Sequence, residues 1–187
     1  MHSRDIHKIL RSRNPVAIGL MVVVLALAYF TQKDGGGAGD PARGVHAGRC
    51  VKVIDGDTVE VEDGAGAVFR VRLLGVDTME TFNEEKLAEQ AARLGRSADN
   101  IRSLGERARA RTRSLALNRP VEWEIPSDTP VRDPYQRILA YVRVDGRDLG
   151  EQLLAEGLAE PRRDRHPRQD RYRAAAKPLV VGTSLTH

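Results

Sequence analysis

The chain has 187 residues, a formal net charge of +4, an apolar fraction of 41% and a charged fraction of 30%. These values exclude a natively disordered chain and leave room for one domain of ordinary size with extensions. Residues 47–187 hold 24 Lys and Arg against 23 Asp and Glu, so the basic balance does not by itself indicate a nucleic-acid-binding domain.

The N-terminal segment has the pattern of a membrane anchor or an export signal. Residues 1–13 are polar and basic, and the uncharged stretch 14–32 would span about 28 Å as a helix, close to the roughly 30 Å core of a bilayer. The basic flank predicts a cytoplasmic N-terminus with the remaining chain outside. We expect a single-pass signal anchor. The alternative is a signal peptide cleaved after Ala26-Leu27-Ala28, which would give a secreted or periplasmic protein.

The rest of the chain divides into three parts. Residues 33–46 are glycine-rich and are expected to form a flexible linker. Residues 47–177 carry the periodic patterns of a folded domain, and residues 178–187 are a tail.

Three strand patterns open the predicted domain. They cover residues 50–54, 58–62 and 68–76, and the short turns between them predict an antiparallel meander. Asp-Gly at 55–56 predicts a tight turn that brings Asp55 and Asp57 close together. Cys50 excludes an intrachain disulfide because it is the only cysteine, and we expect it to be a small buried hydrophobe.

Helices and two more strands follow. Helical patterns cover residues 84–94 and 103–117, the second with Ser103 as N-cap and Glu106 completing a capping box. The spread of Arg107, Arg109, Arg111 and Arg113 around this helix favours a solvated face over a phosphate groove. The remaining elements are strands at 120–125 and 137–144 and helices at 149–156 and near 169–176. Five strands with a helix between the third and fourth predict an α+β, mainly β fold: an OB-fold five-stranded barrel with flanking helices, preceded by the N-terminal hydrophobic helix.

Three motifs carry a family resemblance. They are Ile54-Asp55-Gly56-Asp57-Thr58, then Arg72 with Val76-Asp77-Thr78-x-Glu80, then Tyr135-x-Arg137 with Leu139-Ala140-Tyr141. In this order they resemble the staphylococcal nuclease (thermonuclease-like) family, and the resemblance covers residues from about 48 to 176. Each motif alone is weak, and their ordered combination is specific.

The resemblance implies an exported, metal-dependent nuclease that hydrolyses phosphodiester bonds of DNA, with RNA as a further substrate to consider. The matched positions make Arg72 and Arg137 the groups that grip the phosphate, because a guanidinium offers bidentate donors. They make Glu80 the general base. Tyr135 matches a residue beside the bound nucleotide, where an aromatic ring can stack on a base.

The resemblance also implies a cation site. The family's ion is typically Ca²⁺, held by the positions that match Asp57, Asp77 and the backbone carbonyl of Thr78, with Asp55 supporting the site. Mg²⁺ or Mn²⁺ would also suit these hard oxygen ligands. We expect a monomer that acts on nucleic acid and contacts the membrane only through residues 14–32.

Several departures leave alternatives open. Met79 stands where the family usually has proline, and Pro161-Arg162-Arg163 stands where the type member has pocket tyrosines. A non-catalytic OB-fold module that binds nucleic acid or protein at the cell surface is therefore the competing hypothesis, with the two arginines as ordinary ion-pair partners. The extra residues at 84–100 either border the cleft or pad the surface. The arginine-rich stretch 162–173 either contacts phosphates or is solvated.

Overall fold

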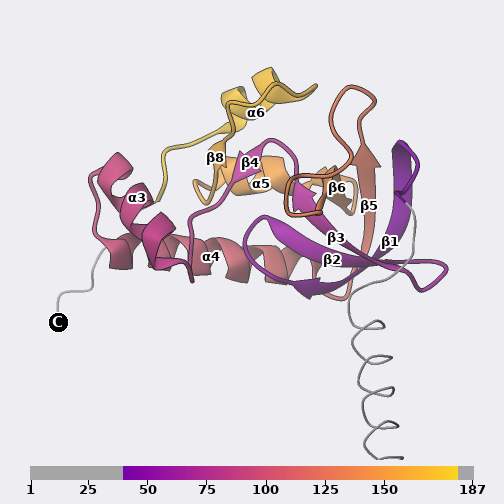
Figure 1. Cartoon of the computed structure of the whole chain (residues 1–187), viewed down its shortest axis with the longest axis horizontal. Coiled ribbons are helices and arrows are strands. Elements are labelled where there is room, and N and C mark those ends of the chain that lie inside the picture. The colour runs from indigo at the N-terminus through magenta and orange to yellow at the C-terminus, as the bar shows by residue number, and fades with distance from the viewer. Residues whose placement is uncertain (1–39, 181–187) are drawn as a thin grey trace, which may run out of the picture. The chain divides into compact units, whose positions relative to one another are not determined.

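A computed structural model describes residues 40–180, and the predicted membrane segment at 14–32 lies outside this range. The described domain is built on a closed barrel (Figure 1). Its five strands are β1 (Gly44–Val53), β2 (Thr58–Asp63), β3 (Val68–Leu73), β5 (Pro120–Ile125) and β6 (Ile138–Val144). They follow the order β3-β2-β1-β5-β6 with antiparallel neighbours, and a parallel pairing of β3 with β6 closes the barrel. This confirms the predicted α+β class and the five-stranded barrel.

Four helices and three short strands complete the described domain. The helices are α3 (Glu84–Leu94), α4 (Ala98–Ala116), α5 (Leu149–Ala155) and α6 (Gln169–Ala175). Strand β4 (Val76–Asp77) pairs with β8 (Glu160–Pro161), and β7 (Arg147–Asp148) pairs with β6. Figure 1 shows α3 beside the N-terminal end of α4, away from the barrel, while α5 and α6 lie near β4 and β8.

Two apolar clusters hold these elements together. The larger fills the barrel and includes Trp123, Val59 and Leu153, which are almost completely buried. Alternate residues of the strands face this core, as the period-two pattern predicts. The smaller cluster contains Met79, Leu87, Ile101 and Leu104, and it joins α3 and α4 to the segment after β4. Because burial of such side chains is the main stabilising term, this second cluster fixes α3 to the segment that carries Glu80.

Burial also explains the chemical character of Cys50. Its side chain is fully buried in the barrel, and this desolvation raises the pKa of the thiol to about 11. Cys50 therefore behaves as the small hydrophobe that the sequence predicts.

Three predicted element boundaries are wrong, the first being the start of β1, which lies at Gly44 and not at residue 50. The third strand does not run on to residue 76, because Gly75 adopts a left-handed φ of 82° that separates β3 from β4. Helix α4 begins after Ser97, whose side chain accepts a hydrogen bond from the Asn100 N–H at 3.3 Å. Ser103 consequently lies inside the helix and is not its N-cap.

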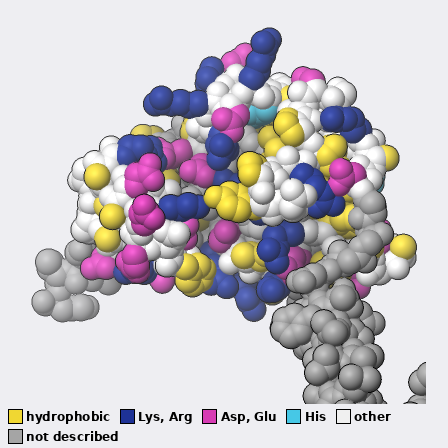
Figure 2. All heavy atoms as spheres, in the orientation of Figure 1, with side chains coloured by type: hydrophobic (Ala, Val, Ile, Leu, Met, Phe, Trp, Pro, Cys, Tyr) yellow, Lys and Arg dark blue, Asp and Glu magenta, His cyan; other side chains and the backbone are white. Residues whose placement is uncertain are grey.

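The folded domain begins before residue 47, and its surface carries charges of both signs. Strand β1 begins at Gly44, within the stretch 33–46 that the composition predicts to be a linker. Among residues 40–180, no helix combines the length and the apolar composition that a membrane crossing needs. Figure 2 shows acidic and basic side chains interspersed on the face in view, in keeping with the near-neutral charge of this region.

Candidate active site

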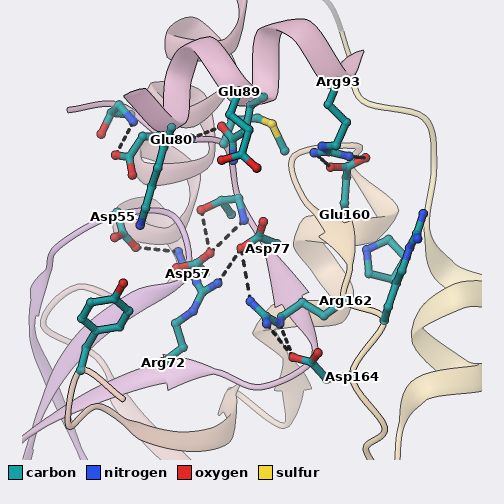
Figure 3. Close-up of a pocket in the computed structure, with 18 of the residues that line it drawn as sticks. Asp55, Asp57, Arg72, Asp77, Glu80, Glu89, Arg93, Glu160, Arg162 and Asp164 are labelled. Atoms are coloured by element: carbon teal, nitrogen blue, oxygen red, sulfur yellow. Dashed lines mark hydrogen bonds and ion pairs between the residues drawn. The ribbon is translucent and has the colours of Figure 1, made fainter. Parts of the chain in front are cut away.

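All eight residues singled out in the sequence line one cavity of about 720 Å³. Their elements are far apart in the chain: the β1–β2 turn, the end of β3, the segment from β4 to residue 80, and the loop before β6. The eight are Asp55, Asp57, Arg72, Asp77, Thr78, Glu80, Tyr135 and Arg137. Figure 3 shows Asp57 and Asp77 directed toward Arg72.

The β1–β2 turn is shaped by close packing. Gly56 has no left-handed φ, but a Cβ at this position would lie 2.7 Å from Ala108 Cβ and 2.8 Å from the Thr78 side chain. The Gly56 carbonyl also accepts a hydrogen bond from Thr112 Oγ1 at 2.6 Å. Glycine is therefore required here because α4 approaches the turn so closely, and not because the turn needs a positive φ.

Asp57 ties this turn to the start of the Glu80 loop, the segment of residues 78–83. It is 3% exposed, and its Oδ2 accepts hydrogen bonds from the Thr78 backbone N–H at 2.8 Å and Oγ1 at 3.0 Å. Asp55 supports the turn by accepting from the Asp57 N–H at 3.1 Å. Burial raises the pKa of Asp55, and the positive charge of Arg72 opposes that shift. Asp55 therefore restrains the backbone at Asp57.

Arg72 lies between two aspartates. It is 7% exposed, its Nη1 forms an ion pair with Asp57, and its Nη2 donates to Asp77 Oδ1 at 2.6 Å. Burial lowers the pKa of Arg72, and the negative charge of Asp77 opposes that shift. The guanidinium is thus held at the cavity wall in one orientation. A phosphate bound here would compete with the aspartates for its donors.

Arg137 is held by a residue that the sequence reading missed. Asp133 Oδ2 accepts from Arg137 Nε at 2.7 Å, and Asp133 Oδ1 accepts from the backbone N–H groups of Tyr135 and Arg137. Burial alone would raise the pKa of Asp133, but these hydrogen bonds and the charge of Arg137 lower it. Aspartate is a frequent turn residue, and this property is the sequence signal that could have found it. Arg137 pairs with Asp133 and not with Glu80, whereas Arg72 does pair with Asp77, so both arginines are ion-paired in this structure and the ion-pair alternative stays open.

Tyr135 stands exposed at the mouth of the cavity. It keeps 71% of its surface, and the Arg137 guanidinium lies 5.4 Å from the centre of its ring. Lys86 Nζ, from helix α3, lies 5.8 Å from the same ring. The ring is thus flanked by two cations, a setting suited to an aromatic group of a polyanionic ligand.

Glu80 is fixed by main-chain hydrogen bonds. Its Oε1 accepts from the backbone N–H groups of Thr81 at 2.9 Å and Phe82 at 3.0 Å. Burial acts to raise the pKa of Glu80, but the hydrogen bonds from Phe82, Thr81 and Asn83 outweigh it and lower the pKa. Glu80 is therefore ionised at neutral pH and able to accept a proton.

Helix α3 supports the Glu80 loop from behind. Gln90 Oε1 accepts from the Glu80 backbone N–H at 2.9 Å. Met79 is 3% exposed and packs in the smaller apolar cluster with Leu87 of α3. These contacts hold the backbone at Met79, the position where the family usually has proline. The segment 84–94 therefore borders the cleft, which resolves the alternative that the sequence left open.

An ion pair joins α3 to β8, and both partners line the cavity. Arg93 Nη2 lies 2.5 Å from Glu160 Oε2 (Figure 3). The Glu160 carboxylate raises the pKa of Arg93 through this hydrogen bond. Next along the chain, Arg162 pairs with Asp164 at 2.6 Å and lies 3.9 Å from Asp77 Oδ1.

The arginine-rich stretch 162–173 is partly neutralised. Arg168 forms ion pairs at 2.5 Å with Asp148 and with Glu124, while Arg171 pairs with Glu151. These acids come from other elements, so much of the local positive charge is compensated. Arg162 and Arg163 do line the cavity, which leaves a phosphate contact open to this part of the stretch.

The donor set fits a hard divalent cation. Asp57 and Asp77 both pair with Arg72 at the cavity wall, and Thr78 donates to Asp57. The carboxylates and the Thr78 carbonyl offer oxygen atoms, the ligand type of Ca²⁺, Mg²⁺ and Mn²⁺. Within residues 40–180, no three His, Cys, Asp or Glu side chains converge in metal-binding geometry. A cation would accordingly take two carboxylates and complete its shell with backbone, water or substrate oxygens.

The described residues thus combine a closed five-stranded barrel with a cavity lined by two buried or half-buried arginines and a group of carboxylates. The family of staphylococcal nuclease homologues matches residues 70–178, and the chain belongs to this family. The matched region includes Arg72, Asp77, Glu80 and Arg137, while Asp55 and Asp57 precede it.

Three relatives that are similar to this chain carry nuclease names. The chain is 35% identical to a thermonuclease of Staphylococcus intermedius over 122 residues, 65% of this chain and 62% of that protein. It is 35% identical to the SPbeta prophage-derived endonuclease YokF of Bacillus subtilis over 108 residues, 58% of this chain and 31% of that protein. It is 29% identical to a thermonuclease of Staphylococcus hyicus over 159 residues, 83% of this chain and 85% of that protein. The first two matches thus span less than two thirds of the relatives' length.

Proposed function

We propose that this chain is a metal-dependent endonuclease that hydrolyses phosphodiester bonds of DNA, with RNA as a second substrate. The observation that carries the proposal is that one cavity gathers two arginines, a glutamate with a lowered pKa and two aspartates from four separate segments. Membership of the staphylococcal nuclease homologue family and the nuclease names of its relatives support the same conclusion.

The two arginines would bind the scissile phosphate. Arg72 reaches the cavity from β3 and Arg137 from the loop before β6, so a phosphoryl group between them would meet donors from two sides. Each is oriented in advance by acidic partners, Asp57 and Asp77 for Arg72 and Asp133 for Arg137. Groups fixed in place stabilise developing charge on the phosphoryl oxygens without a reorganisation cost during the reaction.

Glu80 would act as the general base. Its carboxylate lines the cavity, and main-chain donors keep it ionised and restrict its orientation. A water bound beside it can lose a proton to Glu80 as it attacks phosphorus. A positioned base of this kind typically contributes 10²–10⁴-fold to the rate.

Asp57, Asp77 and the Thr78 carbonyl would hold the cation, for which Ca²⁺ is the first candidate and Mg²⁺ or Mn²⁺ the others. When bound, the cation supplies charge that stabilises the negative phosphoryl oxygens. Asp57 is fixed by Thr78, so the ligands from the turn and from β4 are held together before any cation arrives.

We propose that the protein acts outside the cytoplasm as a monomer. The basic stretch 1–13 followed by the apolar stretch 14–32 supports export, either as a membrane-anchored protein or after cleavage. A reporter fused after His187 should be reached by a protease added outside the cell. A reporter that stays protected in intact cells would contradict export.

The experiment that tests the proposed activity uses the full chain purified in detergent. Single-stranded DNA, duplex DNA and RNA are incubated with Ca²⁺, Mg²⁺ or Mn²⁺, or with a chelator. Internal cleavage that needs a divalent cation supports the proposal. Salt-sensitive binding without cleavage in any of these ions would replace it with the non-catalytic OB-fold module.

A further inference from the structure

A second exposed aromatic side chain, Phe82, lies in the Glu80 loop. The described residues include six Phe, Tyr and Trp side chains, of which four are at most 9% exposed. The two exceptions are Tyr135, at 71%, and Phe82, at 69%. A buried phenylalanine stabilises a fold by apolar burial, so an exposed one two residues from Glu80 contributes little to the core and is available to a ligand.

The main chain fixes where Phe82 stands. Its backbone N–H donates to Glu80 Oε1 at 3.0 Å, and the next residue, Asn83, caps α3 by accepting from the Lys86 N–H at 3.0 Å. From the other side, α4 packs tightly against this segment, since a Cβ on Gly105 would lie 2.4 Å from the Met79 carbonyl oxygen. The ring is thus presented at a set distance from the proposed catalytic base.

An arginine side chain lies beside the Phe82 ring. The guanidinium of Arg109, on α4, lies 5.5 Å from the centre of the Phe82 ring. Arg113 follows one turn later on the same side of α4, about 6 Å along the axis. Among residues 40–180 no acidic side chain forms an ion pair with either arginine, although Glu106 lies three residues before Arg109. Arg111, by contrast, is paired with Glu156 at 2.6 Å.

We propose that Phe82 and Arg109 form a nucleotide subsite next to the catalytic cavity. One base of a single-stranded nucleic acid would stack on the Phe82 ring, and Arg109 would contact an adjacent phosphate. The inference rests on the proposed nuclease function. Phe82 does not line the cavity that holds Tyr135, so the subsite takes a nucleotide beyond the one being cleaved. A paired base offers no free face to the ring, and the subsite therefore selects single strands.

The two exposed aromatic side chains share one arrangement. Tyr135 and Phe82 are the exposed aromatic side chains of the described residues, and both have an arginine beside the ring. An aromatic platform with a cation at its edge is the combination that binds single strands with little sequence preference.

The first test measures binding without cleavage. Phe82→Trp is made in the full chain that also carries Glu80→Gln, and chelator is present throughout. Trp123 is 1% exposed, so the fluorescence gained by Phe82→Trp reports on the subsite. Octathymidylate should quench it by stacking, and dithymidylate should quench it far less. Binding of the octamer, measured by anisotropy, without quenching would overturn the proposal.

The second test compares substrates of two lengths. In Phe82→Ala, the ratio of kcat/KM for octathymidylate to that for dithymidylate should fall about tenfold, and Arg109→Gln should lower it in the same direction. Val68→Ala, an exposed aliphatic on β3, is the matched control and should leave the ratio unchanged. An unchanged ratio in Phe82→Ala would overturn the subsite. Absence of cleavage by the unaltered chain would instead refute the nuclease proposal, and the quenching assay would still decide the subsite.

Discussion

Gln90 offers a direct test of whether helix α3 holds the proposed general base in place. Its Oε1 accepts a hydrogen bond from the Glu80 backbone N–H at 2.9 Å. Gln90→Met preserves the length and the helix preference of the side chain but removes the acceptor. The bonds from Thr81 and Phe82 to the Glu80 carboxylate stay in place, so the substitution loosens the backbone of Glu80 and otherwise changes one side chain of the cavity wall.

The structure sets the size of the expected effects. A neutral hydrogen bond contributes about 0.5–1.5 kcal/mol net, so the free energy of unfolding should fall by about 1 kcal/mol. The fold should persist because the smaller apolar cluster around Leu87 is untouched. Small displacements of a catalytic group are costly, and kcat should fall about tenfold, less than the 10²–10⁴-fold expected on losing the base itself. KM should change less than twofold, because Arg72 and Arg137 are unaffected.

Steady-state kinetics on a single-stranded oligonucleotide with Ca²⁺ measure kcat and KM, and urea unfolding measures stability. Gln152→Met is the matched control, because Gln152 is half-buried on α5 and donates to the Asp148 carbonyl at 3.4 Å, away from the cavity. It should lower stability by a similar amount and leave kcat unchanged. An unchanged kcat in Gln90→Met would refute the positioning role of α3.

Three further outcomes follow from the same geometry. Arg72→Lys should lower kcat/KM at least about a hundredfold with little loss of folding, because an ammonium keeps the charge beside the aspartates but loses the bidentate donors; retained activity would remove Arg72 from the phosphate site. Tyr172→Phe should lower the free energy of unfolding by about 1.5–3 kcal/mol in urea, because the Tyr172 hydroxyl donates to buried Asp148 at 2.8 Å; an unchanged midpoint would contradict this. Gly75→Ala should lower the melting temperature by several degrees, since φ is +82° and the new Cβ would lie 2.4 Å from the His166 ring; an unaltered melting curve would show that this turn relaxes freely.

Local patterns predict the individual strands, while closure of the barrel through the pairing of β3 with β6 joins segments far apart in the chain. Alternation in 58–62 predicts β2 because its side chains face the core and the surface in turn, and this period survives in the folded domain. The start of α4 was less predictable. Ser97 with Asn100 and Ser103 with Glu106 both offer a capping side chain, and only the packing of Ile101 and Leu104 into the smaller cluster selects the earlier one.

Ion pairs between residues far apart in the chain could not be predicted from the sequence. The stretch 162–173 looks strongly basic along the chain, yet Arg168 is compensated by Glu124 and Asp148, 44 and 20 residues away. Similarly, the motifs predict a phosphate-binding role for Arg72 but do not reveal that Asp57 also pairs with it. Such partners become visible only when the barrel closes and brings the segments together.

The central claim is that Glu80 is the base of a cation-dependent phosphodiesterase. The most direct measurement is the pH dependence of kcat/KM for single-stranded DNA with Ca²⁺, for the unaltered chain and for Glu80→Gln. Glu80 has a lowered pKa, so its basic form is present at neutral pH and is lost only as the pH falls through that value. We predict an acid limb centred below the ordinary glutamate value of 4.5 and a loss of at least about a hundredfold in Glu80→Gln. Cation-dependent cleavage at an undiminished rate in Glu80→Gln would contradict the account.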